Sequence, residues 1–206
     1  MPTNNVTSLF KDYKKTAERL RAGDRQVIEA VANTYIDQLY RAALGANLDA
    51  TRAEDVAQAT LVTFLERAKT FDGRSHVRTW LFGILYNKIL EAHRETTRAR
   101  EFDPIDEIVE QRFDADGGWQ RPPQPVDMGV HNEEIRQQID DCLEAVSMRS
   151  QLALILREVE GFSMNEICEI LQLSRSNLGV ALHRGRNRIR ECLEAKGVKG
   201  SGDAKL

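Results

Sequence analysis

The sequence predicts an all-α protein, with two small helical domains joined by a flexible acidic linker and a C-terminal helix-turn-helix. Two observations support this fold class. Apolar residues recur with the 3.6-residue period of a helix along most of the 206 residues, and the alternating runs rich in β-branched residues that are typical of strands are absent. A segment containing Gly, Pro and many acids interrupts this pattern. The length permits one large domain or two small ones, and the interruption favours two.

The N-terminal part predicts two helices between about residues 9 and 44. Gly23-Asp24 marks a break between them, and Gly45 is expected to end the second helix. Apolar residues at helical spacing are expected to form the buried face of the second helix: Val27, Ile28, Val31, Tyr35 and Leu39.

A third helix is expected to begin near Thr51 or Arg52, because Thr51 and Glu54 have the spacing of a capping box. The residues expected to point inward are Ala57, Leu61, Phe64, Leu65 and Ala68. The outward face carries Asp55, Gln58, Val62 and Glu66. An exposed Val62 among polar residues fits a docking surface and, equally well, a single stray apolar side chain.

Next come a glycine-centred turn, Phe71–Ser75, and an aromatic-rich helix expected from about residue 76 to residue 99. Asn87, Arg94 and Arg98 fall on one face of that helix, which is a suitable track for phosphates. Because Glu91 lies between them, spacing alone favours an ordinary solvated face. Trp80 is expected in the core.

Residues 100–132 contain four prolines and a Gly pair, which mark a domain boundary. Between Glu101 and Asp141 there are twelve acids and three arginines, a local net charge of −9. Because the whole chain carries −3, the remainder carries +6. The acidity therefore belongs to one segment and does not exclude a nucleic-acid partner.

The C-terminal part predicts two more helices, one on the stripe Ile135, Ile139, Leu143 and Val146 and one over residues 152–159, followed by a helix-turn-helix. Its first helix has an apolar stripe at Met164, Ile167, Cys168 and Leu171, and Gln172-Leu173-Ser174 interrupts it. The inward stripe of its second helix is Leu178, Leu182, Gly185, Ile189 and Leu193, and its outward side is Ser176, Val180, His183 and Asn187, with Arg184, Arg186, Arg188 and Arg190 at the flanks. This pattern favours binding in a DNA major groove.

Several kinds of site are not expected. Cys142, Cys168 and Cys192 stand far apart without paired spacing, so buried free thiols are expected and no metal site is. We expect no cofactor. No stretch approaches the roughly 20 apolar residues of a membrane helix, and no signal peptide is evident, so a cytoplasmic chain without membrane insertion is expected.

Several motifs in one order resemble bacterial RNA polymerase sigma factors, in particular the two-domain extracytoplasmic-function (ECF) subfamily of the sigma-70 family. They are Ala53-Glu-Asp-Val-Ala-Gln-Ala-Thr60, Phe71-Asp-Gly-Arg-Ser75, Arg78-Thr-Trp-Leu81 with Asn87, Leu156-Arg-Glu-Val-Glu-Gly161 and His183-Arg-Gly-Arg186. The resemblance implies a region 2 domain (1–99), a linker (100–132), a region 4 domain (133–196) and a disordered tail (197–206).

The resemblance also implies partners and roles. Asp55, Gln58, Val62 and Glu66 are expected to bind the clamp helices of the largest subunit of core RNA polymerase, and the polymerase flap is a further expected contact. The residues expected at the minus-ten DNA strand are Phe71, Arg74, Ser75, Tyr86, Asn87, Lys88, Arg94 and Arg98. Of the aromatic residues, Tyr86 is the better candidate for base stacking. Ala59 stands where the family commonly has an acid.

The residues expected at duplex minus-thirty-five DNA are Arg175, Ser176, Asn177, Val180, His183, Arg184 and Arg186. In this helix the chain departs from the family, because Asn177-Leu-Gly-Val-Ala181 lacks two basic residues and a hydroxyl that most members have. Asn177 is expected to pair with adenine and Val180 to touch a thymine methyl group.

We therefore expect a sigma factor that directs promoter-specific initiation and strand opening, is not an enzyme, and has an anti-sigma partner. Two alternatives stay open. One is a helix-turn-helix regulator that acts without core polymerase, and the other is a sigma-like decoy that binds proteins but no longer reads promoters.

Overall fold

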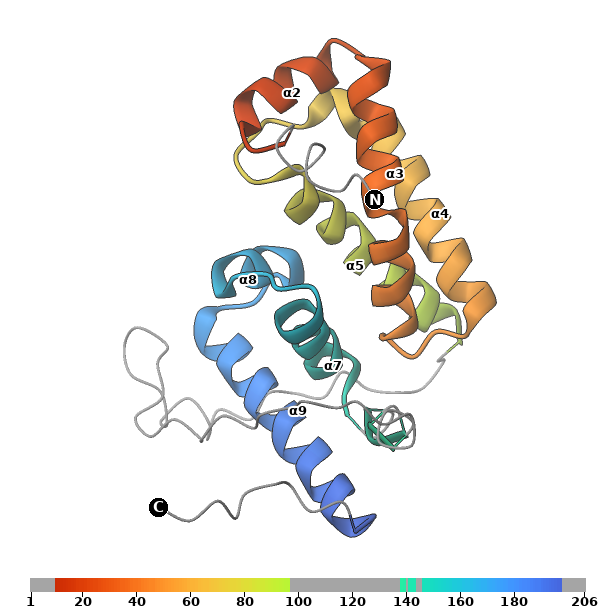
Figure 1. Ribbon diagram of the computed structural model, residues 1–206, viewed down its shortest axis with the longest axis vertical. Coiled ribbons are helices and arrows are strands. Elements are labelled where there is room, and N and C mark those ends of the chain that lie inside the picture. The colour runs from red at the N-terminus through yellow and green to blue at the C-terminus, as the bar shows by residue number, and fades with distance from the viewer. Residues whose placement is uncertain (1–9, 97–137, 140, 144–145, 198–206) are drawn as a thin grey trace, which may run out of the picture. The chain divides into compact units, whose positions relative to one another are not determined.

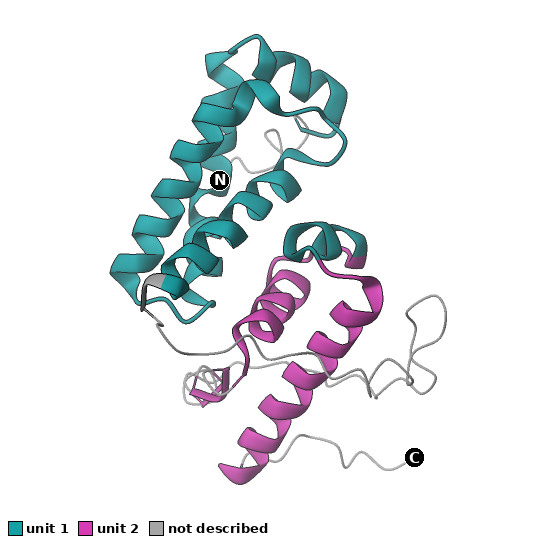
Figure 2. Ribbon diagram, turned by 180° about the vertical axis from the view of Figure 1, so that it is seen from behind, with its two compact units in different colours: residues 1–101, 165–172 teal, residues 102–164, 173–206 magenta. Residues whose placement is uncertain are grey.

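The computed structural model describes residues 10–96, 138–139, 141–143 and 146–197. Every regular element in these ranges is a helix, which confirms the all-α fold class (Figure 1). By their contacts the residues form two compact units, residues 1–101 with 165–172 and residues 102–164 with 173–206 (Figure 2). The linker 100–132, Arg98, Ile135 and residues 198–206 of the expected tail lie outside the described residues.

The first unit contains α2 (Tyr13–Arg21), α3 (Arg25–Leu44), α4 (Ala50–Arg67), the 3₁₀ turn η1 (Ala68–Thr70) and α5 (Val77–Thr96). The break at Gly23-Asp24 is confirmed: Gly23 has φ 73°, and Asp24 caps α3 by accepting the Gln26 and Val27 N–H groups. Gly45 follows the last residue of α3, as expected.

The expected capping box of the third helix is wrong. Helix α4 begins at Ala50, and the carboxylate of Asp49 accepts the N–H of Arg52 at 3.0 Å. Asp49 therefore occupies the N-cap, which leaves Thr51 inside the first turn.

Helices α3, α4 and α5 pack against one another around the core of the first unit. Val27, Val31, Tyr35 and Leu39 of α3 are buried, as predicted, and Ile28 is half-buried. Helix α5 is buried around much of its circumference, through Val77, Leu81, Phe82, Ile84, Leu85, Tyr86 and Ile89. Leu65, which was expected to point inward, is 52% exposed, because the buried stripe of α4 runs through Ala53, Val56, Ala57, Thr60 and Phe64.

The second unit contains α7 (Met148–Leu154), the π-helical segment η3 (Ile155–Val159) and α9 (Arg175–Ala195). Helix α7 packs on α9. The approach is close at Gly185, where an added Cβ atom would lie 2.7 Å from Leu154 Cδ1. This glycine faces inward, as its place in the expected stripe predicted.

Helix α8 (Met164–Leu171) precedes α9 and is separated from it by Gln172–Ser174. Gln172 has φ 54°, and the Ser174 hydroxyl caps α9 by accepting the Asn177 N–H at 3.1 Å. The short helix, the interruption and the second helix thus lie where the sequence predicted them. In α8 the buried residues are Ile167, Ile170 and Leu171, whereas Cys168 is half-buried.

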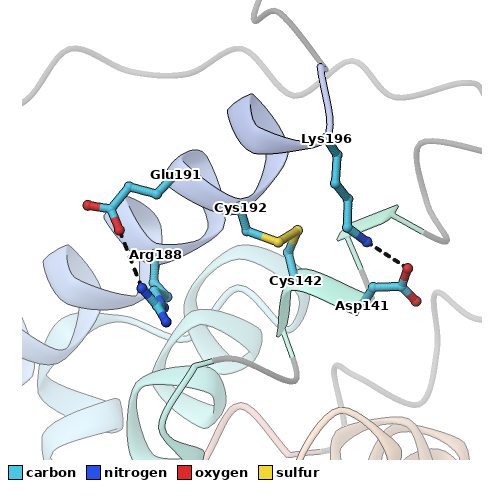
Figure 3. Close-up of a disulfide and its surroundings, with 6 residues drawn as sticks. All are labelled: Asp141, Cys142, Arg188, Glu191, Cys192 and Lys196. Atoms are coloured by element: carbon cyan, nitrogen blue, oxygen red, sulfur yellow. Dashed lines mark hydrogen bonds and ion pairs between the residues drawn. A yellow bond between two sulfur atoms is a disulfide. The ribbon is translucent and has the colours of Figure 1, made fainter.

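The expectation of three free thiols is wrong for two of them. Cys142 and Cys192 form a disulfide with a Cα–Cα distance of 5.7 Å, whereas Cys168 keeps its thiol. The bond joins the helical residues 141–143 to the last turn of α9, and Lys196 Nζ contacts Asp141 Oδ2 beside it at 2.7 Å (Figure 3). A sequence separation of 50 gave no sign of this pairing, because helix packing alone brings the two positions together.

Candidate nucleic-acid and docking surfaces

The outer face of α4 carries an apolar patch bordered by polar groups. Val62 is 53% exposed, and Leu65, three residues further on, is 52% exposed. Asp55, Gln58 and Glu66 are exposed on the same helix, with Gln58 Nε2 donating to Glu54 Oε1 at 3.1 Å. Val62 is therefore one of a pair, which favours a docking surface over a stray apolar side chain. We name this surface, Asp55, Gln58, Val62, Leu65 and Glu66, the α4 face.

The loop of residues 71–75 presents polar groups outward and hides its aromatic residue. Asp72 Oδ1 accepts the Arg74 N–H at 3.1 Å, and the two side chains form an ion pair at 2.9 Å with the Arg74 side chain largely exposed. Phe71 was expected to meet DNA, but it is only 2% exposed, with its ring 5.1 Å from that of Trp80. The apolar core of the unit takes up Phe71, so Arg74 and half-buried Ser75 are the candidates left in this loop.

Helix α5 reverses the expected roles of Trp80 and Tyr86. Tyr86 is 5% exposed, which excludes it from stacking on a base in this conformation. Trp80 was expected in the core, but it is half-buried, with its ring edge-on to Phe64 at 6.0 Å. Trp80 therefore replaces Tyr86 as the aromatic candidate for a DNA strand.

Polar candidates follow the outer side of α5. Asn87 is exposed, although its Nδ2 donates to the Gly83 carbonyl at 3.0 Å. Lys88 pairs with Glu91 at 2.8 Å, and Arg94 is exposed. The Lys88–Glu91 pair is a surface pair of low stability, so a phosphate competes with Glu91 for the lysine.

On α9, Arg175 is exposed and Ser176, His183 and Arg184 are half-buried. Arg186 pairs with Glu158 of η3 at 2.5 Å, and His183 Nε2 lies 2.8 Å from Asn187 Nδ2. The expected outward position of Val180 is wrong: Val180 is 1% exposed and neighbouring Ala181 is buried. As placed, Val180 therefore cannot touch a thymine methyl group.

Asn177 is half-buried, and its Oδ1 atom is buried with no hydrogen-bond partner in the described part of the chain. A bidentate contact with adenine needs both amide atoms, so the amide must turn outward to make it. At this part of the helix the apolar pattern extends further around the circumference than the single stripe assumed from the sequence.

Across the described ranges, no group of three or more His, Cys, Asp or Glu side chains is placed to hold a metal ion. Among the same residues, no helix has both the length and the apolar content needed to cross a membrane.

The helical fold, the helix-turn-helix and the polar outer faces define a DNA-binding protein of two helical units. Family models match both parts of the chain: Sigma-70 region 2 over residues 31–99 and Sigma-70 region 4 over residues 136–189. The RNA polymerase sigma factor YlaC of Bacillus subtilis is 30% identical over 141 residues, covering 68% of this chain and 76% of its own. The ECF RNA polymerase sigma factor SigX of the same organism is 26% identical over 171 residues, covering 82% and 84%.

Two solved structures share the fold. The sigma factor RpoE, in complex with the anti-sigma factor NepR from Bartonella quintana, aligns with a TM-score of 0.57 at 24% identity, covering 77% of this chain and 91% of its own. CnrH, in complex with the cytosolic domain of CnrY, aligns with a TM-score of 0.64 at 19% identity, covering 90% and 99%. The chain belongs to the sigma-70 family and is an ECF sigma factor, a protein that directs RNA polymerase to promoters.

Proposed function

We propose that this sigma factor binds core RNA polymerase through the α4 face and reads promoter DNA with α5, the 71–75 loop and α9. The exposed pair Val62 and Leu65 is the observation that carries the proposal. Apolar side chains bordered by polar residues on a helix surface are typical of a protein-docking site. The pair also lies within the region 2 match, in a family that acts with RNA polymerase.

The expected size of the contact follows from the side chains. Replacing Val62 and Leu65 by alanine removes five carbon atoms, each equivalent to about 0.8 kcal/mol when fully buried. Because both side chains are already half-covered, about 2 kcal/mol remains to be gained on docking. The double variant is therefore expected to bind core polymerase roughly thirtyfold more weakly.

The test is a fluorescence titration of labelled sigma factor with core RNA polymerase. Leu44→Ala is the matched control, because Leu44 is an exposed apolar residue at the end of α3. Asp55→Ala with Gln58→Ala is expected to weaken binding as well. Unchanged affinity in the Val62, Leu65 double variant, or an equal loss in the Leu44 control, contradicts the docking role of the α4 face.

For DNA we propose a division between the two family regions. Arg74, Ser75, Trp80, Asn87, Lys88 and Arg94 contact the minus-ten strand, and Arg175, Ser176, His183, Arg184 and Arg186 contact the minus-thirty-five duplex. The first unit has exposed cations and a half-buried indole, which fits a strand that is held by phosphate contacts and base stacking. The ion pairs Arg74–Asp72 and Arg186–Glu158 must open for these arginines to bind phosphate.

We further propose that the chain acts in the cytoplasm as a specificity subunit rather than an enzyme, and that an anti-sigma protein controls it. RpoE was solved with the anti-sigma factor NepR, which supports this last point by likeness of fold. Co-purification of the tagged chain from its own cells, with identification of a stoichiometric partner other than polymerase, tests it.

A further inference from the structure

The 71–75 loop is supported by residues that precede the region 2 match. That match begins at residue 31, whereas Phe10 and α2 lie earlier in the chain and pack near the loop. Helix α2 also packs on η1, the turn that leads into the loop. The N-terminal helix therefore contacts the segment that carries Arg74.

The middle of the loop is fixed against the backbone of α2. Gly73 has φ 74°, and a Cβ atom there would lie 2.7 Å from the Tyr13 carbonyl oxygen and 3.0 Å from Ala17 Cβ. At these distances a Cβ atom would overlap the backbone of α2, so only glycine fits at position 73. The start of the loop is fixed separately, since the Phe71 ring is buried against Trp80.

The end of the loop is fixed by His76, which has two kinds of contact. Its Nδ1 atom accepts the Arg78 N–H at 3.0 Å, and its carbonyl accepts the Trp80 N–H at 3.2 Å, so His76 is the N-cap of α5. Its ring packs edge-on against Tyr13 at 5.4 Å and Phe10 at 6.4 Å. A serine or asparagine supplies the cap but not these ring contacts.

We propose that α2 and His76 form a support that sets the conformation of the 71–75 loop, with His76 as a positioning residue for base selection at the minus-ten element. The proposal rests on the DNA role proposed above for Arg74 and Ser75. Phe71, Gly73 and His76 fix the loop at three points within six residues, while Asp72 and Arg74 are exposed and Ser75 is half-buried. Because the loop is already ordered before binding, capturing a base costs it little conformational entropy. Its fixed geometry also lets it discriminate between bases.

The test uses the full chain bound to core RNA polymerase. The probe is a labelled non-template oligonucleotide selected from a random pool by the unmodified complex, together with its single-base variants. The quantity measured is the ratio of Kd values for substituted and selected oligonucleotides. The variants are His76→Ala, which loses cap and ring, and His76→Asn, which keeps a cap acceptor, with Glu18→Gln on the exposed side of α2 as the control.

Loss of an N-cap corresponds to about a fivefold change in an equilibrium. His76→Ala loses both the cap and the ring contacts and is therefore expected to lower the selectivity ratio at least about fivefold with unchanged core affinity. His76→Asn keeps the cap but loses the ring contacts with Tyr13 and Phe10, so it is expected to recover only part of that loss, and Glu18→Gln is unaffected. Full selectivity in His76→Ala overturns the proposal, and full selectivity in His76→Asn overturns the part of it that assigns the support to the ring contacts with α2. Arg74→Ala tests the DNA role of the loop separately from its support by α2 and His76. If this variant leaves oligonucleotide affinity unchanged, the DNA role of the loop itself is refuted.

Discussion

Replacing Gly73 by alanine is expected to destabilise the first unit far more than replacing Gly23, although the two glycines share almost the same backbone conformation. Their φ angles are 74° and 73°. An alanine in this left-handed region costs about 1–2 kcal/mol, and about 0.4–1 kcal/mol of this is offset because the unfolded chain becomes less flexible. Both variants carry this common cost.

The difference between the variants comes from packing. Nothing lies within 4 Å of a Cβ atom at Gly23, whereas at Gly73 the new atom meets the Tyr13 carbonyl oxygen at 2.7 Å. A backbone oxygen in a helix cannot turn aside as a flexible side chain does, so α2 or the loop must move. Overpacking of this kind costs about 1–3 kcal/mol. Gly73→Ala is therefore expected to be less stable than Gly23→Ala by about 1–3 kcal/mol.

The assay is urea unfolding of the full chain followed by tryptophan fluorescence. The chain has two tryptophans, so a Trp119→Phe background leaves Trp80, in the first unit next to Phe71, as the reporter. The free energy of unfolding is compared between the two variants at equal slope. Equal stabilities within about 0.5 kcal/mol would refute the claim that α2 and the loop are packed against each other.

Other predictions concern caps and the disulfide. Asp49→Ala is expected to cost about 1 kcal/mol in urea unfolding, while Thr51→Ala costs less, and the reverse order would contradict the observed start of α4. Reduction, or Cys142→Ser with Cys192→Ser, is expected to lower the stability of the second unit by up to about 4 kcal/mol through the loss of a 50-residue cross-link. Thermal melting by circular dichroism with and without dithiothreitol checks this, with Cys168→Ser as the control. Identical curves under both conditions would mean that the cross-link does not form in solution.

Local patterns predicted the helices and their order well. The break at Gly23-Asp24, the stripe of α3 and the interruption at Gln172–Ser174 each depend on residues within one or two turns, and each lies where the sequence placed it. Gly185 was also assigned correctly, because its place in a helical stripe is enough to turn it inward. The patterns did not predict how wide each buried face is, since that depends on which helices pack alongside.

Most errors at the candidate site share this cause. Phe71 and Tyr86 were expected to meet DNA from the resemblance to the family, and Val180 from its place on the outward side of the second helix, yet all three are buried. Leu65 was expected to be buried but is exposed, because the helices that pack against α4 decide which of its sides is buried. The signal for the α4 face was nevertheless present, because Leu65 follows Val62 by three residues and shares its side of the helix.

The support under the 71–75 loop was missed for a different reason. Phe10, Tyr13 and His76 are 66 residues apart at the extremes, so no local periodicity relates them. The cysteine pair was missed in the same way, since Cys142 and Cys192 meet only after α9 has packed. Finding long-range pairs of this kind requires either the three-dimensional structure or covariation between sequence positions.

Reconstituted transcription tests the central claim most directly. Core RNA polymerase lacking any sigma factor is combined with the purified chain on a pool of random promoter templates, and run-off transcripts are sequenced. We predict transcripts that start at defined sites sharing two upstream elements, with the yield reduced when Val62 and Leu65 are replaced by alanine. An absence of sigma-dependent transcripts on every template, despite stable binding to core polymerase, would contradict promoter reading and favour a protein-binding decoy.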